Sequence, residues 1–154
     1  MLAKAEVAIA ALASVTLIGG AASARTSLPA ERTFLVPLSG EAGLNALPAP
    51  VLAGDTDASG QVQLKVDLER KLICYDFTVS GVATPLMAHI HKGSARDTGP
   101  SVVTLFTGPG SDLDDCRTWT EKWLAEIVAN PSGFYVNFYT TEFPDGALRG
   151  QLLG

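Results

Sequence analysis

The sequence of 154 residues is short of several side chains on which common chemistries depend. It holds only two histidines, so any site that needs three of them is excluded. Lysine and arginine form no cluster and the formal net charge is −5, which argues against nucleic acid or an anionic membrane as a partner. Neither a Gly-x-Ser-x-Gly nor a His-Glu-x-x-His motif occurs, so little supports a serine hydrolase or a zinc protease.

The first 24 residues are typical of a secretory signal peptide. A positively charged start precedes an apolar run from Val7 to Ile18, and Ala22-Ser23-Ala24 has the small-x-small cleavage pattern. Cleavage after Ala24 is therefore predicted, which leaves one mature domain, residues 25–154. The apolar run is shorter than a membrane span of about 20 residues. We expect no stable span after cleavage, and a location in the periplasm or outside the cell.

Two cysteines, Cys74 and Cys116, remain in the predicted mature domain. An oxidising compartment favours a disulfide between them. Such a bridge would close a loop of about 40 residues, and this restriction of the unfolded chain stabilises a fold by about 3–4 kcal/mol. The acidic stretch before Cys116, residues 111–115, lacks the spacing of a calcium-binding loop. We interpret that stretch as a solvated loop.

Several short segments alternate apolar and polar residues, as β-strands with one buried face do. In residues 61–68, for example, Val62, Leu64 and Val66 alternate with polar side chains. Residues 44–60 are rich in Ala, Pro, Gly and Asp, which predicts a loop. The predicted strands are residues 33–38, 61–68, 72–79, 87–91, 101–106, 134–140 and 147–153.

One segment has the helical period instead. Residues 120–128 carry apolar side chains at the spacing of one helix face. Thr120 is a suitable N-cap, and Asn130-Pro131 ends the helix. Many short strands and one short helix predict an all-β fold, namely an antiparallel Greek-key β-sandwich of immunoglobulin-like or superoxide-dismutase-like architecture.

The two histidines lie two residues apart, in Ala88-His89-Ile90-His91. Residues i and i+2 of a β-strand point to the same face, so both imidazoles should project side by side. Imidazole is the commonest metal-binding side chain and titrates near neutrality. The pair is therefore the strongest indication of chemistry in the sequence.

Several ordered motifs run through the predicted mature domain. They are Ala88-His89-Ile90-His91-x-Gly93, Gly99-Pro100, Asn130-Pro131, Phe134-Tyr135-Val136-Asn137 and Phe143-Pro144-x-Gly146-Ala147-x-Arg149-Gly150-Gln151. From about Arg32 to the C-terminus the chain resembles a CHRD domain, the module named after the animal protein chordin. The resemblance implies an extracytoplasmic all-β domain. In chordin these modules belong to a protein that binds growth factors.

The sequence departs from the family pattern at one informative position. Where the family commonly reads Tyr-Val-Asn-Val-His-Thr, this chain has Tyr139 in place of the histidine. Asn137 and Tyr139 should share a strand face. If this strand lies beside the histidine pair, the resemblance implies that His89, His91 and Tyr139 converge.

Two imidazoles and a phenolate suit a ferric or cupric ion. We therefore hypothesise that His89, His91 and Tyr139 bind one iron or copper ion. A complete copper–zinc dismutase site is excluded, because it needs more histidines. Arg149 is also predicted to form an ion pair with Asp76, Glu142 or Asp145. The candidates for a fourth ligand or for the surrounding shell are Asp76, Tyr135, Asn137, Glu142 and Arg149.

Three other interpretations stay open at this point. The same surface could bind an extracytoplasmic protein or a small ligand without any metal. A mononuclear metal centre with an open position could act on oxygen species, which would make the protein an enzyme. The histidine pair could also serve only to hold the loop between Lys92 and Pro100.

Overall fold

The computed structural model describes residues 27–42 and 54–154. The predicted signal peptide and most of the loop predicted at 44–60 lie outside these residues. No helix in the described part of the chain is long and apolar enough to cross a membrane. The elements in chain order are β1 (Glu31–Ser39), η1 (Gly40–Ala42), β2 (Ser59–Asp67), β3 (Leu72–Ser80), β4 (Pro85–Lys92), β5 (Ser101–Thr107), β6 (Asp114–Thr118), α1 (Glu121–Ala129), η2 (Pro131–Gly133), β7 (Phe134–Thr140) and β8 (Leu148–Gln151).

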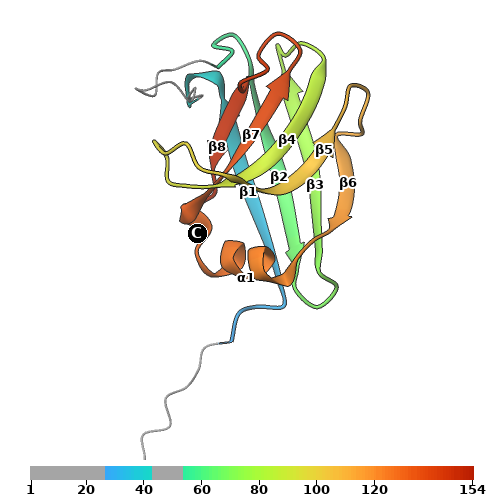
Figure 1. Ribbon diagram of the computed structural model, residues 1–154, viewed down its shortest axis with the longest axis vertical. Coiled ribbons are helices and arrows are strands. Elements are labelled where there is room, and N and C mark those ends of the chain that lie inside the picture. The colour runs from blue at the N-terminus through green and yellow to red at the C-terminus, as the bar shows by residue number, and fades with distance from the viewer. Residues whose placement is uncertain (1–26, 43–53) are drawn as a thin grey trace, which may run out of the picture.

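The strands form one nearly closed antiparallel sheet in the order β5-β4-β7-β8-β1-β2-β3-β6 (Figure 1). The β8–β1 register extends over a single residue pair, and the sheet folds back on itself there. We call β5, β4, β7 and β8 the histidine layer, and β1, β2, β3 and β6 the disulfide layer. The all-β prediction with one short helix is confirmed.

The two edge strands of this sheet, β5 and β6, are joined by side chains. Arg117 Nε donates to the Leu105 carbonyl at 3.0 Å, and Trp119 Nε1 donates to the Val102 carbonyl at 2.7 Å. Both donors come from β6 or the residue after it, and both acceptors are backbone groups of β5. These contacts hold the open seam of the sheet together without continuing the strand ladder.

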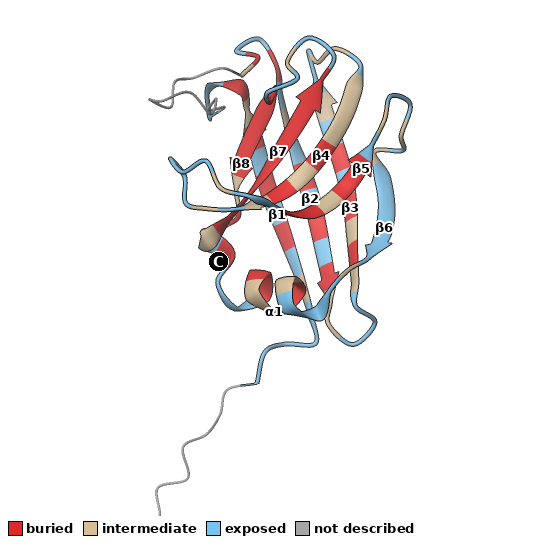
Figure 2. Cartoon of the chain, in the orientation of Figure 1, coloured by how far each residue is buried: buried red, intermediate tan, exposed pale blue. Residues whose placement is uncertain are grey.

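The core lies between the two layers. Buried and exposed residues alternate along most of β1 and β2 (Figure 2). Val62, Leu64 and Val66 are fully buried. Each fully buried side chain of this size contributes about 1.5–3 kcal/mol. The rings of Phe77, Phe106 and Phe138 pack against one another with centroids 5.3–5.8 Å apart. The apolar residues whose alternation predicted these strands are therefore the residues that the fold buries.

Helix α1 covers one end of the sheet (Figure 1). It buries Leu124, Ile127 and Val128, three of the residues at helical spacing. Thr120 precedes it with extended backbone, as an N-cap should, but its side chain makes no capping hydrogen bond. The helix ends at Ala129, immediately before the predicted stop.

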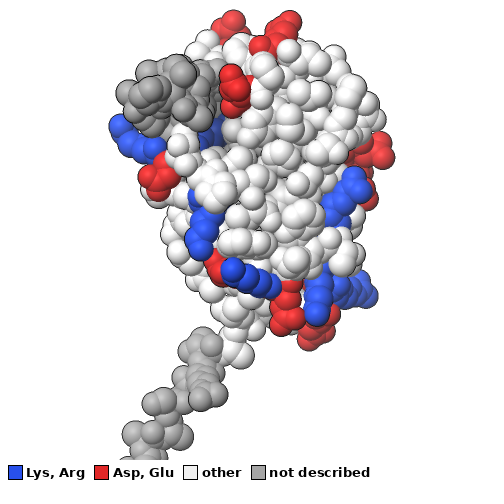
Figure 3. Space-filling model, in the orientation of Figure 1, with Lys and Arg blue, Asp and Glu red and all other residues white. Residues whose placement is uncertain are grey.

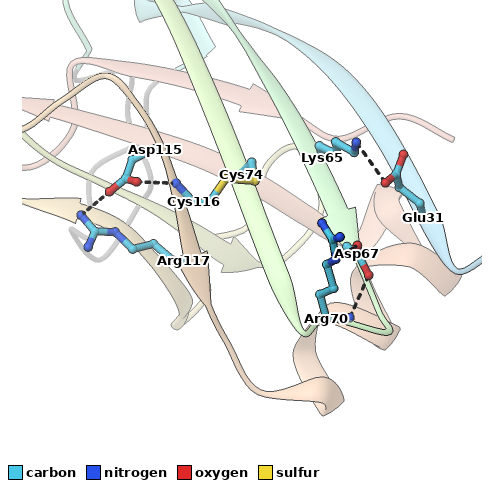
Figure 4. Close-up of a disulfide and its surroundings, with 8 residues drawn as sticks. All are labelled: Glu31, Lys65, Asp67, Arg70, Cys74, Asp115, Cys116 and Arg117. Atoms are coloured by element: carbon cyan, nitrogen blue, oxygen red, sulfur yellow. Dashed lines mark hydrogen bonds and ion pairs between the residues drawn. A yellow bond between two sulfur atoms is a disulfide. The ribbon is translucent and has the colours of Figure 1, made fainter.

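The predicted disulfide is confirmed, and it joins β3 to β6 (Figure 4). Cys74 and Cys116 face each other directly in the β3–β6 register. The prediction that residues 111–115 form a solvated loop is wrong at its end, because Asp114 and Asp115 belong to β6. All five residues of β6 are exposed, so the strand has no apolar alternation by which to recognise it.

Candidate functional site

Strand β7 differs from the other strands because all seven of its residues are buried (Figure 2). Val136 and Phe138 point into the core, as expected. The alternate residues Tyr135, Asn137 and Tyr139 point to the outer face, yet they are only 3%, 8% and 9% exposed. Polar side chains are therefore sealed beneath the surface of the histidine layer.

The β4–β7 register places the histidine pair beside these residues. His89 lies opposite Asn137, and His91 lies opposite Tyr135. The ring centroids of His89 and His91 are 5.9 Å apart, and those of His89 and Tyr139 are 5.5 Å apart. The structure thus brings together the three side chains that were proposed as metal ligands.

Hydrogen bonds orient the His91 ring. Its Nδ1 lies 2.8 Å from the Gly99 carbonyl oxygen, and its Nε2 lies 2.9 Å from Tyr139 Oη. A carbonyl can only accept, so we assign the proton to Nδ1. Nε2 then accepts a hydrogen bond from the Tyr139 hydroxyl. His91 does tie down the loop between Lys92 and Pro100, and it also turns a lone pair toward Tyr139.

Burial changes the protonation equilibria of these groups. It lowers the pKa of His89, and the neighbouring His91 acts in the same direction. It also lowers the pKa of His91; the Gly99 carbonyl opposes this change and Arg149 adds to it. Burial raises the pKa of Tyr139, against the opposing effect of the Asn137 side chain. At neutral pH both imidazoles are neutral, the form that binds metals, and the phenol keeps its proton.

Arg149 is a buried cation at the centre of this region, with 3% exposure. Its guanidinium carbon lies 3.3 Å from the Tyr135 ring centroid, and Nη2 donates to the Ser94 and Asp97 carbonyls at 2.9 Å each. Burial lowers its pKa. The predicted ion pair is wrong: among the described residues no carboxylate lies within 4.0 Å of it. Backbone carbonyls of the covering loop take the place of an acid.

The side-chain oxygen of Asn137, Oδ1, is one of three buried side-chain atoms, with Tyr75 Oη and Gln151 Oε1, that lack a hydrogen-bond partner among the described residues. An acceptor left in this state costs about 1–3 kcal/mol. The amide packs against Gly146, where an added Cβ would come within 2.8 Å of Nδ2 and 3.0 Å of Oδ1. Gly146 also has a φ of +128°, so its lack of a side chain serves both the turn and this contact.

A small cavity of about 140 Å³ opens beside these groups. A larger hollow of about 430 Å³ lies at the β5–β6 seam, and none of the predicted site residues line it. The face over the histidine layer has its charged side chains mostly around its edges (Figure 3). The smaller cavity is lined by His91, Thr98, Gly99, Tyr135, Asn137, Tyr139 and Asp145.

Two predicted candidates lie apart from the cluster. Asp76 is exposed on β3 in the disulfide layer, opposite Gln63 and Asp114. Glu142 is exposed in the turn after β7. Within residues 27–42 and 54–154, no three side chains of His, Cys, Asp and Glu gather as a metal site. The cluster described above instead combines imidazoles with a phenol and an amide.

The sequence assigned no role to Gly99 or Gln151, and it named Asp145 only as an ion-pair partner of Arg149 and not as a residue that lines the cavity. Gly99 orients His91 through its backbone carbonyl, and Gln151 Nε2 donates to the Gly93, Ser132 and Phe134 carbonyls. The Gly99-Pro100 motif was visible, but a backbone acceptor leaves no side-chain signature. Gln151 was visible only as part of the C-terminal motif.

Comparison with family models matches the CHRD domain over residues 34–152, which is nearly the whole described chain. No curated protein matches, and no solved structure does. The CHRD match and the Cys74–Cys116 disulfide are consistent with an extracellular domain.

Proposed function

The chain belongs to the CHRD domain family, and on that basis we propose that it is an exported module that binds one transition-metal ion, iron or copper, through His89, His91 and Tyr139. The export half of the proposal rests on the predicted signal peptide and on the disulfide. The metal half rests on the cluster beneath the histidine layer.

The orientation of His91 is the observation that carries the metal proposal. Metal-binding histidines commonly donate one ring N–H to a backbone carbonyl, which fixes the other nitrogen as the ligand. His91 Nδ1 has such a partner in Gly99, and Nε2 lies 2.9 Å from Tyr139 Oη. Two donors that each bind one ion at about 2.0–2.1 Å are separated by about 2.9 Å when the angle at the ion is 90°, as in the tetragonal geometry of Cu(II). The two atoms are therefore close enough to bind the same ion, and 2.9 Å is also the length of an ordinary hydrogen bond.

Tyrosine in this set favours Fe(III) or Cu(II), which stabilise a phenolate. The Tyr139 hydroxyl proton, which forms a hydrogen bond with His91 Nε2, must leave when the ion binds. We therefore expect metal uptake near neutral pH to release one proton from Tyr139 per ion.

A metal-free binding module is the second candidate. It is favoured by the cavity beside Tyr139 and by the fact that both nitrogens of His91 already have partners within the protein. In this case the polar cluster would only shape a surface for a small ligand or an extracellular protein. Metal titration separates the two candidates.

The experiment titrates the full chain with Cu(II) and with Fe(III), each supplied as the nitrilotriacetate complex. We expect one ion per chain and a visible phenolate-to-metal band. His89→Ala should lose binding without unfolding, because the His89 ring has no hydrogen-bond partner among the described residues. Tyr139→Phe should lose the band.

Asp76→Asn is the matched control, because it alters an exposed acid in the disulfide layer and should change neither result. The metal proposal fails if the wild-type chain binds neither ion. It also fails if His89→Ala binds as tightly as the wild type.

A further inference from the structure

Asn137 occupies the position on β7 that lies directly opposite His89 on β4. Side chains paired in this way have Cβ atoms about 4.5–5.5 Å apart on one face of the sheet. Asn137 also lines the same cavity as His91 and Tyr139. The register therefore places an amide among the three proposed ligands.

The Asn137 side chain is held with its oxygen uncommitted. The residue is 8% exposed, and Oδ1 has no partner in the described part of the chain. Folding normally pairs such atoms, and those that stay unpaired call for an explanation. A bound cation would satisfy this oxygen in the same way as a hydrogen-bond donor.

The other candidates for a fourth ligand offer no comparable atom. Tyr135 Oη accepts a hydrogen bond from the Gly99 N–H, and Arg149 is a cation. Asp76 lies in the disulfide layer, and Glu142 is exposed in a turn. Among the five residues singled out from the sequence, only Asn137 has a buried oxygen without a partner.

We infer that Asn137 Oδ1 is a fourth protein ligand of the metal ion, which deepens the proposed function and rests on it. Gly146 is then a positioning residue, because any side chain there would displace the amide. The set becomes two nitrogens and two oxygens, with Tyr139 as its one anionic donor. Such a mixed N,O set suits Cu(II), whereas the higher charge of Fe(III) favours additional anionic oxygen.

Asn137→Leu tests the inference, because leucine has a similar shape and lacks the oxygen. We expect Cu(II) affinity to fall by at least about tenfold, since loss of an outer-shell partner alone has an effect of that size. The phenolate band should remain, at a shifted wavelength, because Tyr139 is intact. The metal-free variant should unfold at no lower urea concentration than the wild type, because the substitution removes an unpaired polar atom. Asp76→Asn again serves as the control.

Asn137→Asp provides a second measurement, which is independent of whether the leucine variant folds. A carboxylate at this position adds an anionic oxygen, so the ratio of Fe(III) to Cu(II) affinity should rise. Wild-type affinity and an unshifted band in Asn137→Leu, or an unchanged metal ratio in Asn137→Asp, would overturn the inference and leave the proposed function standing. A wild-type chain that binds no metal would overturn both.

Discussion

The outer faces of the two layers of the sheet differ in how far their residues are buried. In the disulfide layer the outward residues of β1 and β2 are mostly exposed, and Leu35 keeps 62% of its surface in contact with solvent. In the histidine layer the outward residues of β7 are also buried. The covering comes from the loop at residues 93–100 and from the turn that holds Gly146. Burial on both faces, with polar residues on one, marks where a site can form.

The difference also shows in how each layer is held. Strand β6 has no buried residue and depends on its pairing with β3, on the disulfide and on the side chains that reach β5. The histidine layer buries apolar residues in the core and, on its outer face, adds polar contacts beneath the loop at residues 93–100, centred on Arg149 and Tyr135. The disulfide stabilises one layer and the buried polar contacts stabilise the other. Substitutions in the two layers should therefore change the free energy of unfolding by different amounts.

The largest effect is expected from removing the disulfide. Replacing both Cys74 and Cys116 with serine opens a loop with a sequence separation of 42, and the free energy of unfolding should fall by about 4 kcal/mol. Urea denaturation measures this loss. Because the bridge lies in the disulfide layer, Cu(II) affinity of the folded double variant should stay at the wild-type value. A matching loss of affinity would show that the two layers are not independent.

Arg149→Met and Lys65→Met compare one cation in each layer. Arg149 is buried over Tyr135 and donates to two carbonyls, so its loss should reduce the free energy of unfolding by about 2–3 kcal/mol. Lys65 forms an exposed ion pair with Glu31, and its loss should cost less than about 1 kcal/mol. Urea denaturation of both variants gives the comparison. Equal losses would contradict the distinction between the layers.

A smaller effect is expected from single hydroxyl groups. Tyr139→Phe removes the hydrogen bond from Oη to His91 Nε2 and should destabilise the metal-free protein by about 0.5–1.5 kcal/mol. Thr78→Val alters an exposed hydroxyl on β3 and should change stability by less than about 0.5 kcal/mol. If the two variants unfold at the same urea concentration, the hydrogen bond adds nothing to the stability of the histidine layer.

The contrast between the layers also explains which parts of the fold were predictable. In β2 burial alternates with a period of two, and the apolar residues Val62, Leu64 and Val66 show the same period in the sequence. Strand β6 was missed because pairing and a disulfide hold it, and neither produces apolar alternation. Local pattern therefore predicts strands that bury one face, and it fails for a strand that buries none.

The site was predictable only in part. The period of a strand placed His89 and His91 on one face, and the CHRD resemblance directed attention to Tyr139. Which strands would be neighbours could not be derived from local pattern, so Asp76 in the other layer was considered alongside Asn137. The carbonyls that hold Arg149 and His91 belong to loop backbone, which carries no residue-type signal.

The smallest expected effect is a pH dependence that belongs to the histidine layer alone. Burial holds the pKa values of His89 and His91 below the ordinary value of about 6.5, so the unfolded chain takes up protons there first. The stability that neutral histidines provide is therefore complete above pH 6.5 and is lost as the pH falls through the lowered values of the folded protein. Each histidine faces the other, and His91 also faces Arg149, whose charge opposes protonation. Urea denaturation of the metal-free protein between pH 7.5 and pH 5 measures the slope, and the double variant His89→Gln, His91→Gln should abolish it. A slope that survives in the double variant would place the titrating groups outside the histidine layer.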